Sequence, residues 1–370
     1  MRLPRRTATL AALAALTCLL QTATTRAAPT TDPPASAPAG DGCEQTSTLV
    51  RLVATSPAIS RVAGWLCQPP QPAHPDTVQL LVHGFSYNHW YWLGLGYPRL
   101  DYIRAAASAG YPTFVIDQIG AGFSTHPDPN LVTFPNLAYV LHQLVTDLRT
   151  GRIGHPAHRF ARVVGVGHSM GAGQWLTEAS TYRDVDAVVV ADFLHTTDAA
   201  TVATLRAHNI VVANTEPRFA GLPAGYLTMQ PRSVFYDPTL ADPQVIARDE
   251  RIGADTGTVG ELATIDAARD PQLSARIRVP VLVVTGRQDT FACNPGIGLS
   301  CATASDVLAR EAGDYPTSRC LGAYTLDSGH DTNLHPDAPA WFGYAAWWIT
   351  TTVAVHHGGA ATGRACAVHH

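Results

Sequence analysis

The feature that most constrains this chain is a serine between glycines, Gly167-His168-Ser169-Met170-Gly171. Residues 162–166 before it form an apolar, β-branched run that is typical of a central parallel strand. Residues 171–178 after it suit a helix packed closely on a sheet. Glycines on either side of the serine leave room for a sharp strand-to-helix turn that projects the hydroxyl above the sheet, where helix N–H groups face developing negative charge. The pattern predicts an exposed nucleophile, and the alternative is a glycine-rich turn with an incidental serine.

Length and composition limit the remaining options. The chain has 370 residues, 46% of them hydrophobic and 15% charged, with a formal net charge of −4. This length allows one large α/β domain with an insertion or two small domains. The mild acidity gives no reason to expect nucleic acid or anionic membranes as partners. All 25 basic residues are arginines, which excludes any mechanism that needs a lysine base or Schiff base.

The first 27 residues have the pattern of a secretory signal peptide. Arg2, Arg5 and Arg6 give the positive start, residues 10–20 the apolar stretch, and Thr25-Arg26-Ala27 a cleavage site. The apolar stretch is too short to span a bilayer. A twin-arginine route and a lipoprotein signal at Cys18 are weaker alternatives. Residues 28–42 predict a disordered Pro/Ala/Thr tether, so we expect a secreted, extracellular protein whose folded domain spans residues 43–370.

Six cysteines remain beyond the signal: Cys43, Cys67, Cys293, Cys301, Cys320 and Cys366. An even number in an exported chain predicts disulfides rather than free thiols or metal ligands. The sequence leaves their connectivity open. The pairing we favour is Cys43–Cys67, which brackets an N-terminal strand pair, and Cys293–Cys301, which closes a short Pro/Gly loop. Cys320 is then left to pair with Cys366.

Apolar runs alternate with helical segments along most of the chain. Strands are predicted at residues 77–82, 113–116, 162–166, 187–191, 279–286 and 323–326, and helices at 98–110, 136–148 and 341–355. This alternation predicts an α/β fold with a parallel sheet covered on both faces. Between residues 194 and 275 the alternation breaks into loops and helical pieces at 242–251 and 258–268. About eighty residues between two core strands predict a lid rather than a second domain.

Four motifs in this order resemble the α/β-hydrolase family, specifically its exported serine hydrolases of the esterase and lipase type. They are His83-Gly84-Phe85, Gly120-Ala121-Gly122-Phe123-Ser124 after Asp117, the serine turn, and an acid and a histidine downstream, in the family order Ser, Asp or Glu, His. The resemblance covers residues 45–357. It implies a mostly parallel central sheet with helices on both faces and an inserted lid at residues 194–275.

The resemblance also implies a catalytic triad of Ser169, Asp289 and His330. Asp289 directly follows an apolar strand, and His330 follows the last strand. Asp192, at the end of the preceding strand, is the alternative acid because some family members carry the acid there. Other histidines near the motifs are expected to have structural roles: His83 and His168 in backbone turns, and His335 at the start of a helix.

This triad would carry out acyl transfer. Serine is a poor nucleophile at its ordinary pKa, so His330 would take its proton, while Asp289 would fix the imidazole tautomer and stabilise the imidazolium. The resemblance implies that the backbone N–H groups of Phe85 and Met170 form the oxyanion hole. Serine at this position, where family members that open epoxides or displace halide carry a carboxylate, favours ester or amide substrates.

Aromatic residues follow the first motif, in Ser86–Trp92. Tyr87 and Trp90 are expected to bind substrate, with packing of the loop against the lid as the alternative. Apolar residues of the lid are expected to face an acyl chain: Phe219, Leu222, Tyr226, Leu227 and Met229. No phosphate loop, zinc spacing or calcium loop is apparent, so no cofactor or metal is expected. The histidine pairs at 356–357 and 369–370 are expected to be solvated.

The sequence thus predicts an exported serine hydrolase that cleaves a small-molecule carboxylic ester through an acyl-enzyme on Ser169, without stable membrane insertion. An amidase, a peptidase or a perhydrolase would use the same residues. A non-catalytic binding module on the same scaffold is the alternative from another class. The acyl length, the physiological substrate and the oligomeric state stay open.

Overall fold

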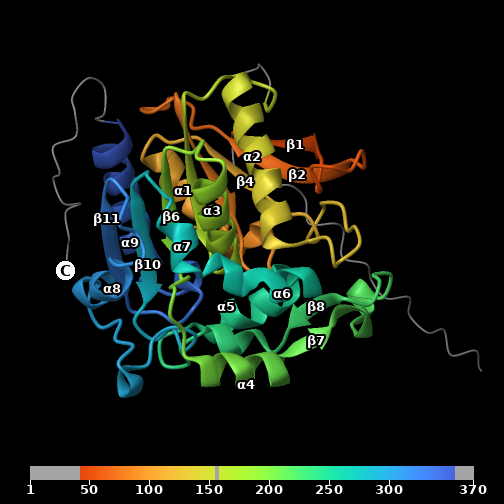
Figure 1. Cartoon of the computed structure of the whole chain (residues 1–370), viewed down its shortest axis with the longest axis vertical. Coiled ribbons are helices and arrows are strands. Elements are labelled where there is room, and N and C mark those ends of the chain that lie inside the picture. Colours follow the sequence, from red (N-terminus) through yellow and green to blue (C-terminus); the bar gives the residue numbers. More distant parts are fainter. Residues whose placement is uncertain (1–41, 155–157, 355–370) are drawn as a thin grey trace, which may run out of the picture. The chain divides into compact units, whose positions relative to one another are not determined.

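The structure, a computed structural model, describes residues 42–154 and 158–354 (Figure 1). The predicted signal peptide, nearly all of the predicted tether, Cys366 and the C-terminal histidine pairs lie outside these residues. Among the described residues, no helix combines the length and apolar character needed to cross a membrane.

The framework of the described residues is an eight-stranded, mostly parallel sheet in the order β1-β2-β4-β3-β5-β6-β10-β11. β1 and β2 pair with each other antiparallel, and β2 also runs antiparallel to β4, whereas the other neighbours are parallel. The strands are β1 (Cys43–Val50), β2 (Ser60–Cys67), β3 (Thr77–Val82), β4 (Thr113–Ile116), β5 (Arg162–His168), β6 (Ala187–Ala191), β10 (Val281–Gly286) and β11 (Leu321–Leu326).

Helices cover both faces of this sheet (Figure 1). Val188 and Val190 of β6 share one apolar cluster with the helices α2 and α3, whereas Val189 shares the opposite cluster with α1 and α9. Because successive side chains of a strand point to opposite faces, a sheet buried on both sides needs continuous apolar runs. The helices of this framework are α1 (Tyr102–Ser108), α2 (Phe134–Thr150), α3 (Met170–Thr181), α8 (Ala304–Glu311) and α9 (Ala338–Ile349).

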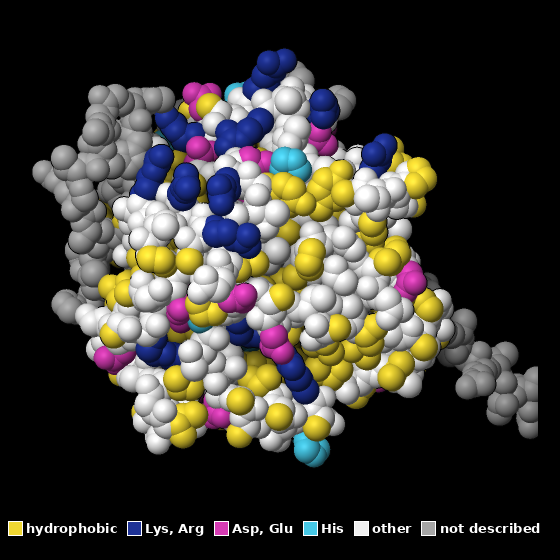
Figure 2. Space-filling view, in the orientation of Figure 1, with side chains coloured by type: hydrophobic (Ala, Val, Ile, Leu, Met, Phe, Trp, Pro, Cys, Tyr) yellow, Lys and Arg dark blue, Asp and Glu magenta, His cyan; other side chains and the backbone are white. Residues whose placement is uncertain are grey.

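Most of the segment between β6 and β10 forms a layer of its own beside the carboxyl ends of the parallel strands (Figure 1). It holds a small antiparallel sheet, β7-β8-β9, in which β8 lies in the middle. Figure 2 shows many hydrophobic side chains on the face that this segment presents. Its elements are α4 (Ala199–Asn209), β7 (Ile210–Val212), β8 (Tyr226–Met229), α5 (Pro243–Arg248), β9 (Gly257–Thr258), α6 (Val259–Ala268) and α7 (Pro271–Ser274).

Two of the predicted disulfides lie within the described residues. Cys43 and Cys67 are opposite each other in the β1–β2 register and are bonded. Cys293 and Cys301 are bonded across the short loop after β10. The third predicted pair includes Cys366, which lies outside the described residues.

Candidate active site

Ser169 occupies the sharp turn between β5 and α3. Its backbone has a positive φ of 51° with ψ of −123°, a strained conformation for a residue with a side chain. The neighbouring glycines are required by close packing: a Cβ at Gly167 would lie 2.4 Å from the nitrogen of Ala172, and a Cβ at Gly171 would lie 2.4 Å from the carbonyl oxygen of His83. The turn therefore holds the serine at the carboxyl end of a central strand.

Ser169, His330 and Asp289 are joined by hydrogen bonds. The Oγ atom of Ser169 lies 2.8 Å from Nε2 of His330, and Nδ1 of His330 lies 3.0 Å from Oδ2 of Asp289. Asp289 is fully buried, and its second carboxylate oxygen accepts a hydrogen bond from the backbone of Phe291 at 2.9 Å. With Nδ1 donating to the carboxylate, Nε2 is left to accept the serine proton, which is the arrangement that nucleophilic catalysis needs.

Aromatic rings fix the orientation of the His330 imidazole. The ring of Phe291 stacks on it with centroids 4.3 Å apart, and the ring of Phe235 lies 5.7 Å away. Phe235 belongs to the segment between β6 and β10, so this segment contacts the imidazole directly. These contacts limit ring rotation and exclude water from one side of the histidine.

Asp192, the alternative acid, lies close to the triad but is bonded differently. Its Oδ1 atom accepts from the backbone nitrogen of Gly286 at 3.0 Å and from the hydroxyl of Thr285 at 3.3 Å. Among the described residues, it makes no hydrogen bond to His330. Burial and the charge of Asp289 raise the pKa of Asp192 well above its ordinary value. The structure thus brings Asp289, and not Asp192, onto the histidine.

His168 supports the loop that carries His330. Its Nε2 atom donates to the carbonyl oxygen of His330 at 3.0 Å, and its ring stacks on Tyr91 at 4.1 Å. Burial lowers the pKa of His168 well below its ordinary value, so the imidazole is neutral at physiological pH. His335 accepts from the backbone nitrogen of Gly329 at 3.1 Å. Both histidines therefore position the His330 backbone.

His83 has a different structural role. Its Nδ1 atom donates to the carbonyl oxygen of Gly84 at 2.9 Å, and its Nε2 atom accepts from the backbone of Gln118 at 3.1 Å. The imidazole thus links the loop after β3 to the loop after β4.

Phe85 and Met170, whose backbone N–H groups are the predicted oxyanion hole, line the same cavity as Ser169. Within the described part of the chain, neither group donates a hydrogen bond to a protein acceptor. Met170 is the first residue of α3, where a helix leaves its N–H groups unsatisfied. Stabilising a developing oxyanion requires donors of this kind, N–H groups near Ser169 without a protein acceptor.

A buried arginine that the sequence analysis missed holds the loop containing Phe85. Arg232 is fully buried and donates from one terminal nitrogen to both the hydroxyl and the carbonyl oxygen of Ser86, at 2.9 and 3.1 Å. Its Nε atom contacts Asp249 at 3.2 Å, and its guanidinium stacks over the ring of Tyr87 at 3.7 Å. Arg232 and Asp249 belong to no recognised motif, so nothing in the sequence distinguished them from surface charges of the insertion.

A cavity of about 60 Å³, partly open to solvent, extends from Ser169 and His330 under the inserted segment. Its walls are mostly apolar, as in small-molecule sites in general. Helices α4 and α6 and strand β8 supply several of these side chains: Val202, Leu205, Met229, Leu262 and Ile265. The other walls include Phe85, Met170, Leu194, Ile210, Phe235 and Phe291.

The two aromatic residues predicted to bind substrate are separated by the fold. Tyr87 lines the catalytic cavity. Trp90 instead lines a different cavity, beside Arg104 and Arg248. The short 3₁₀ turn His89–Tyr91 explains the difference, since it directs neighbouring side chains apart and gives the contact with His168 to Tyr91 instead.

The five apolar lid residues named from the sequence are also divided. Met229 lines the catalytic cavity, and the other four do not. Tyr226 is buried, and its hydroxyl donates to the carbonyl oxygen of Pro127 at 2.7 Å. It therefore anchors the inserted segment to the loop before α2 rather than facing the cavity.

Comparison with known proteins places this architecture in a family. Residues 79–342 match the family described as "Alpha/beta hydrolase family". No curated protein matches the sequence significantly. Among solved structures, a bromoperoxidase from Bacillus anthracis is similar with a TM-score of 0.54 and 18% identity, covering 83% of this chain and 99% of that one.

Two further structures share the fold. The monoacylglycerol lipase of Paleococcus ferrophilus has a TM-score of 0.52 and 13% identity, covering 78% of this chain and 99% of the lipase. An E-2-(acetamidomethylene)succinate hydrolase has a TM-score of 0.51 and 18% identity, covering 84% of this chain and all of the hydrolase. The likeness to these structures concerns the fold alone. Since the family match spans more than half of its length, the chain belongs to the alpha/beta hydrolase family.

Proposed function

We propose that this protein is a serine hydrolase that cleaves carboxylic esters through an acyl-enzyme on Ser169. The observation that carries the proposal is the hydrogen-bonded series from Ser169 through His330 to the buried Asp289, with distances of 2.8 and 3.0 Å. It opens into an apolar cavity that can accept an acyl chain. Family membership supports hydrolase activity, while the ester chemistry rests on this geometry.

In the first half of the reaction, the Oγ atom of Ser169 attacks the ester carbonyl carbon while Nε2 of His330 takes its proton. The carbonyl oxygen becomes an oxyanion that accepts hydrogen bonds from the N–H groups of Phe85 and Met170. Each such donor is typically worth about 3 kcal/mol of transition-state stabilisation. When the tetrahedral intermediate collapses, the carbon–oxygen bond to the alcohol breaks, and the imidazolium returns the proton to the leaving alcohol.

In the second half, water replaces the alcohol. His330 removes a proton from the water as its oxygen attacks the acyl carbon, and the same two N–H groups stabilise the second oxyanion. Collapse then breaks the bond to Ser169, which regains its proton from His330, and releases the carboxylic acid. An amidase or peptidase would follow the same steps with an amine as leaving group, and a perhydrolase would replace water with hydrogen peroxide.

The test combines covalent labelling with a substrate panel. A fluorophosphonate probe should add its mass to one tryptic peptide containing Ser169, and p-nitrophenyl esters should be cleaved faster than p-nitroanilides of the same acyl group. Faster cleavage of anilides would support the amidase alternative. If a folded protein neither takes up the probe nor cleaves any ester or anilide, the non-catalytic alternative stands instead.

We also propose that the chain is exported. Residues 1–27 have the three parts of a secretory signal. The two disulfides support this proposal, because such bonds persist mainly in oxidising compartments. Expression of the full chain in its host should yield extracellular protein whose N-terminus begins near residue 28. Protein found only inside the cell with an intact Met1 would contradict the proposal.

We further propose that the segment at residues 194–275 acts as a substrate lid, and that its cavity-lining side chains set the acyl-length preference. Leu205→Ala and Met229→Ala should deepen the cavity and shift the preferred p-nitrophenyl ester to a longer acyl chain, with about 10-fold changes for long chains and less than 2-fold changes for acetate. Leu222→Ala is the matched control, because Leu222 belongs to the same segment but does not line the cavity. Acyl-length profiles are the measurement, and identical profiles in all three variants would contradict the lid role.

A further inference from the structure

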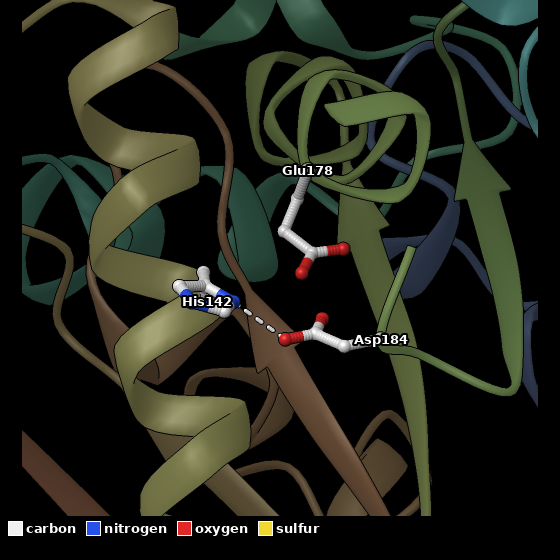
Figure 3. Close-up of side chains that lie close together, drawn as sticks. All are labelled: His142, Glu178 and Asp184. Atoms are coloured by element: carbon white, nitrogen blue, oxygen red, sulfur yellow. Dashed lines mark hydrogen bonds and ion pairs between the residues drawn. The ribbon is translucent and has the colours of Figure 1, made fainter. Parts of the chain in front are cut away.

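A histidine and two carboxylates lie close together beside α3, away from the cavity at Ser169. His142 lies on α2, Glu178 lies on α3, and Asp184 lies in the loop before β6. Figure 3 shows the three side chains pointing toward one another. One ligand atom from each lies within 4.8 Å of the others. None of the three lines the catalytic cavity.

The burial of Glu178 and its lack of hydrogen-bond donors distinguish this cluster from an ordinary surface ion pair. Glu178 is completely buried, and neither of its carboxylate oxygens receives a hydrogen bond from a donor among the described residues. A buried carboxylate without donors is costly unless a positive charge or a proton compensates it. Burial and the adjacent Asp184 raise its pKa well above the ordinary value, although Arg149 opposes this shift.

The charged groups nearby do not supply the missing positive charge. Arg149 uses one terminal nitrogen for Asp186, at 2.7 Å, and for the carbonyl oxygen of Asp184. His142 contacts the outer oxygen of Asp184 at 2.5 Å, and its ring stacks on Tyr182 at 4.3 Å. The other oxygen of Asp184 and both carboxylate oxygens of Glu178 therefore lack a hydrogen-bond donor among the described residues. Such a pair needs either a shared proton or a cation.

We propose that His142, Glu178 and Asp184 bind a zinc ion. One imidazole nitrogen and two carboxylate oxygens suit zinc, which binds its ligands about 2 Å away and commonly takes three protein ligands and a water. Because His142 and Asp184 are partly exposed, an ion and a water can reach the site. The ion would join α2, α3 and the loop before β6, and so stabilise the helix that directly follows Ser169.

A second group of the same residue types provides an internal comparison. His195, Glu311 and Asp314 also lie close together. There, however, Glu311 accepts from the backbone and from the ring of His195, at 3.2 and 2.7 Å, and the other ring nitrogen of His195 contacts Ser274 at 2.8 Å. Since its donors and acceptors are already matched, this group should not bind zinc.

The experiment is a calorimetric titration of the metal-free mature protein with zinc chloride at pH 7.5. Wild type should bind one ion at this site, and Glu178→Gln should weaken this binding by at least about 100-fold. Zinc should raise the Tm of wild type and of Asp314→Asn but not that of Glu178→Gln. Asp314→Asn is the matched control and should keep wild-type affinity. The C-terminal histidines are present in every variant, so zinc bound there contributes equally. Equal zinc affinity in wild type and a folded Glu178→Gln protein, or an equal loss in Asp314→Asn, would overturn the proposal.

Two arginines lie in the wall of the cavity at Ser169. Arg206 on α4 and Arg269 after α6 both line this mostly apolar space, which Asp192 and Thr197 also line. Arg269 donates from Nε to the carbonyl oxygen of Leu194 at 3.2 Å and stacks over Phe193 at 4.3 Å. In the described part of the chain, neither guanidinium has a carboxylate within ion-pair distance.

The environment of these arginines favours an anion. Burial lowers the pKa of Arg269 to about 10, with Asp266 opposing and the charge of Arg206 adding to the decrease. Two guanidinium groups thus share one wall, and the carboxylates whose charges act on Arg269, namely Asp266, Asp289 and Glu311, all lie beyond ion-pair distance. A guanidinium pairs strongly with a carboxylate when both are withdrawn from water.

We infer that the preferred acyl group ends in a carboxylate, which Arg206 and Arg269 bind while the ester lies at Ser169. This inference rests on the proposed ester hydrolysis. Mono-p-nitrophenyl esters of dicarboxylic acids should be better substrates than uncharged esters of equal length. Arg206→Gln and Arg269→Gln should each lower kcat/KM at least about 10-fold for the charged esters and less than about 2-fold for the uncharged ones.

Arg251→Gln is the matched control, since Arg251 is an exposed arginine of the same segment and does not line the cavity. Comparing charged and uncharged esters over several acyl lengths distinguishes failure of the proposed hydrolase function from failure of the carboxylate site. If no ester of either kind is hydrolysed, the proposed function fails. If both kinds are hydrolysed and the Arg206→Gln variant affects them equally, the function stands and the carboxylate site is wrong.

Discussion

Replacing Ser169 with alanine should abolish hydrolysis while leaving the fold intact. Loss of the nucleophile from a comparable triad lowers turnover by about a million-fold, which leaves only the contribution of the oxyanion hole and substrate binding. The substitution removes one partly exposed oxygen whose hydrogen-bond partner is His330, so it leaves no cavity in the core. The measurement is the kcat of the purified variant on the best p-nitrophenyl ester, with circular dichroism to confirm folding.

Loss of activity in Ser169→Ala is informative only if the variant keeps the backbone conformation of the turn. The variant should keep the positive φ, since Gly167 and Gly171 still hold the surrounding backbone. Its Tm should therefore lie close to that of wild type, and it should fail to react with the fluorophosphonate probe. Activity within 10-fold of wild type in a probe-resistant protein would show that another residue attacks the substrate.

Asp289→Asn should lower turnover by about 10⁴-fold, because an amide at this position no longer enforces the imidazole tautomer in which Nε2 is free to accept a proton. The contact between Asp289 and Nδ1 of His330 at 3.0 Å is the basis for this expectation. Steady-state kcat on the same ester is the measurement. The Asn side chain is nearly isosteric, so folding should be preserved and can be checked by the Tm.

Asp192→Asn is the comparison that tests the assignment of the acid. Its carboxylate accepts from Gly286 and Thr285 and does not contact His330. The substitution should therefore reduce turnover much less than Asp289→Asn does. A larger loss in Asp192→Asn would move the catalytic acid to the end of β6.

The framework was predictable because its signals are local and repeated. Strands β3, β4 and β6 begin and end where their apolar runs do, at residues 77–82, 113–116 and 187–191. Helix ends were less accurate, since single capping side chains decide them. Asp101 caps α1 and delays its start to Tyr102, while Thr133 caps α2 and allows it to begin at Phe134.

The short strands and long-range contacts of the inserted segment could not be predicted from the sequence. Strands β7, β8 and β9 have two to four residues, which is too short for a side-chain period to be recognised. Pairing between distant segments makes them strands. The motif residues could be named because each follows a predictable strand. The contacts of Arg232 with Ser86 and of Phe235 with His330 depend on how the insertion folds back, and no local pattern records that.

The placement of Arg232 has a consequence for exchanging parts between members of this fold. A segment that shapes the substrate cavity would be an attractive unit to transplant, because new specificities could then be assembled on a constant hydrolase core. Here that unit also carries the buried cation that holds Ser86, directly beside Phe85, the proposed oxyanion donor. A chimaera that receives a foreign insertion without Arg232 and Asp249 would leave the Ser86 carbonyl without its arginine donor. A chimaera of this protein must therefore exchange the insertion and the loop at residues 83–87 together.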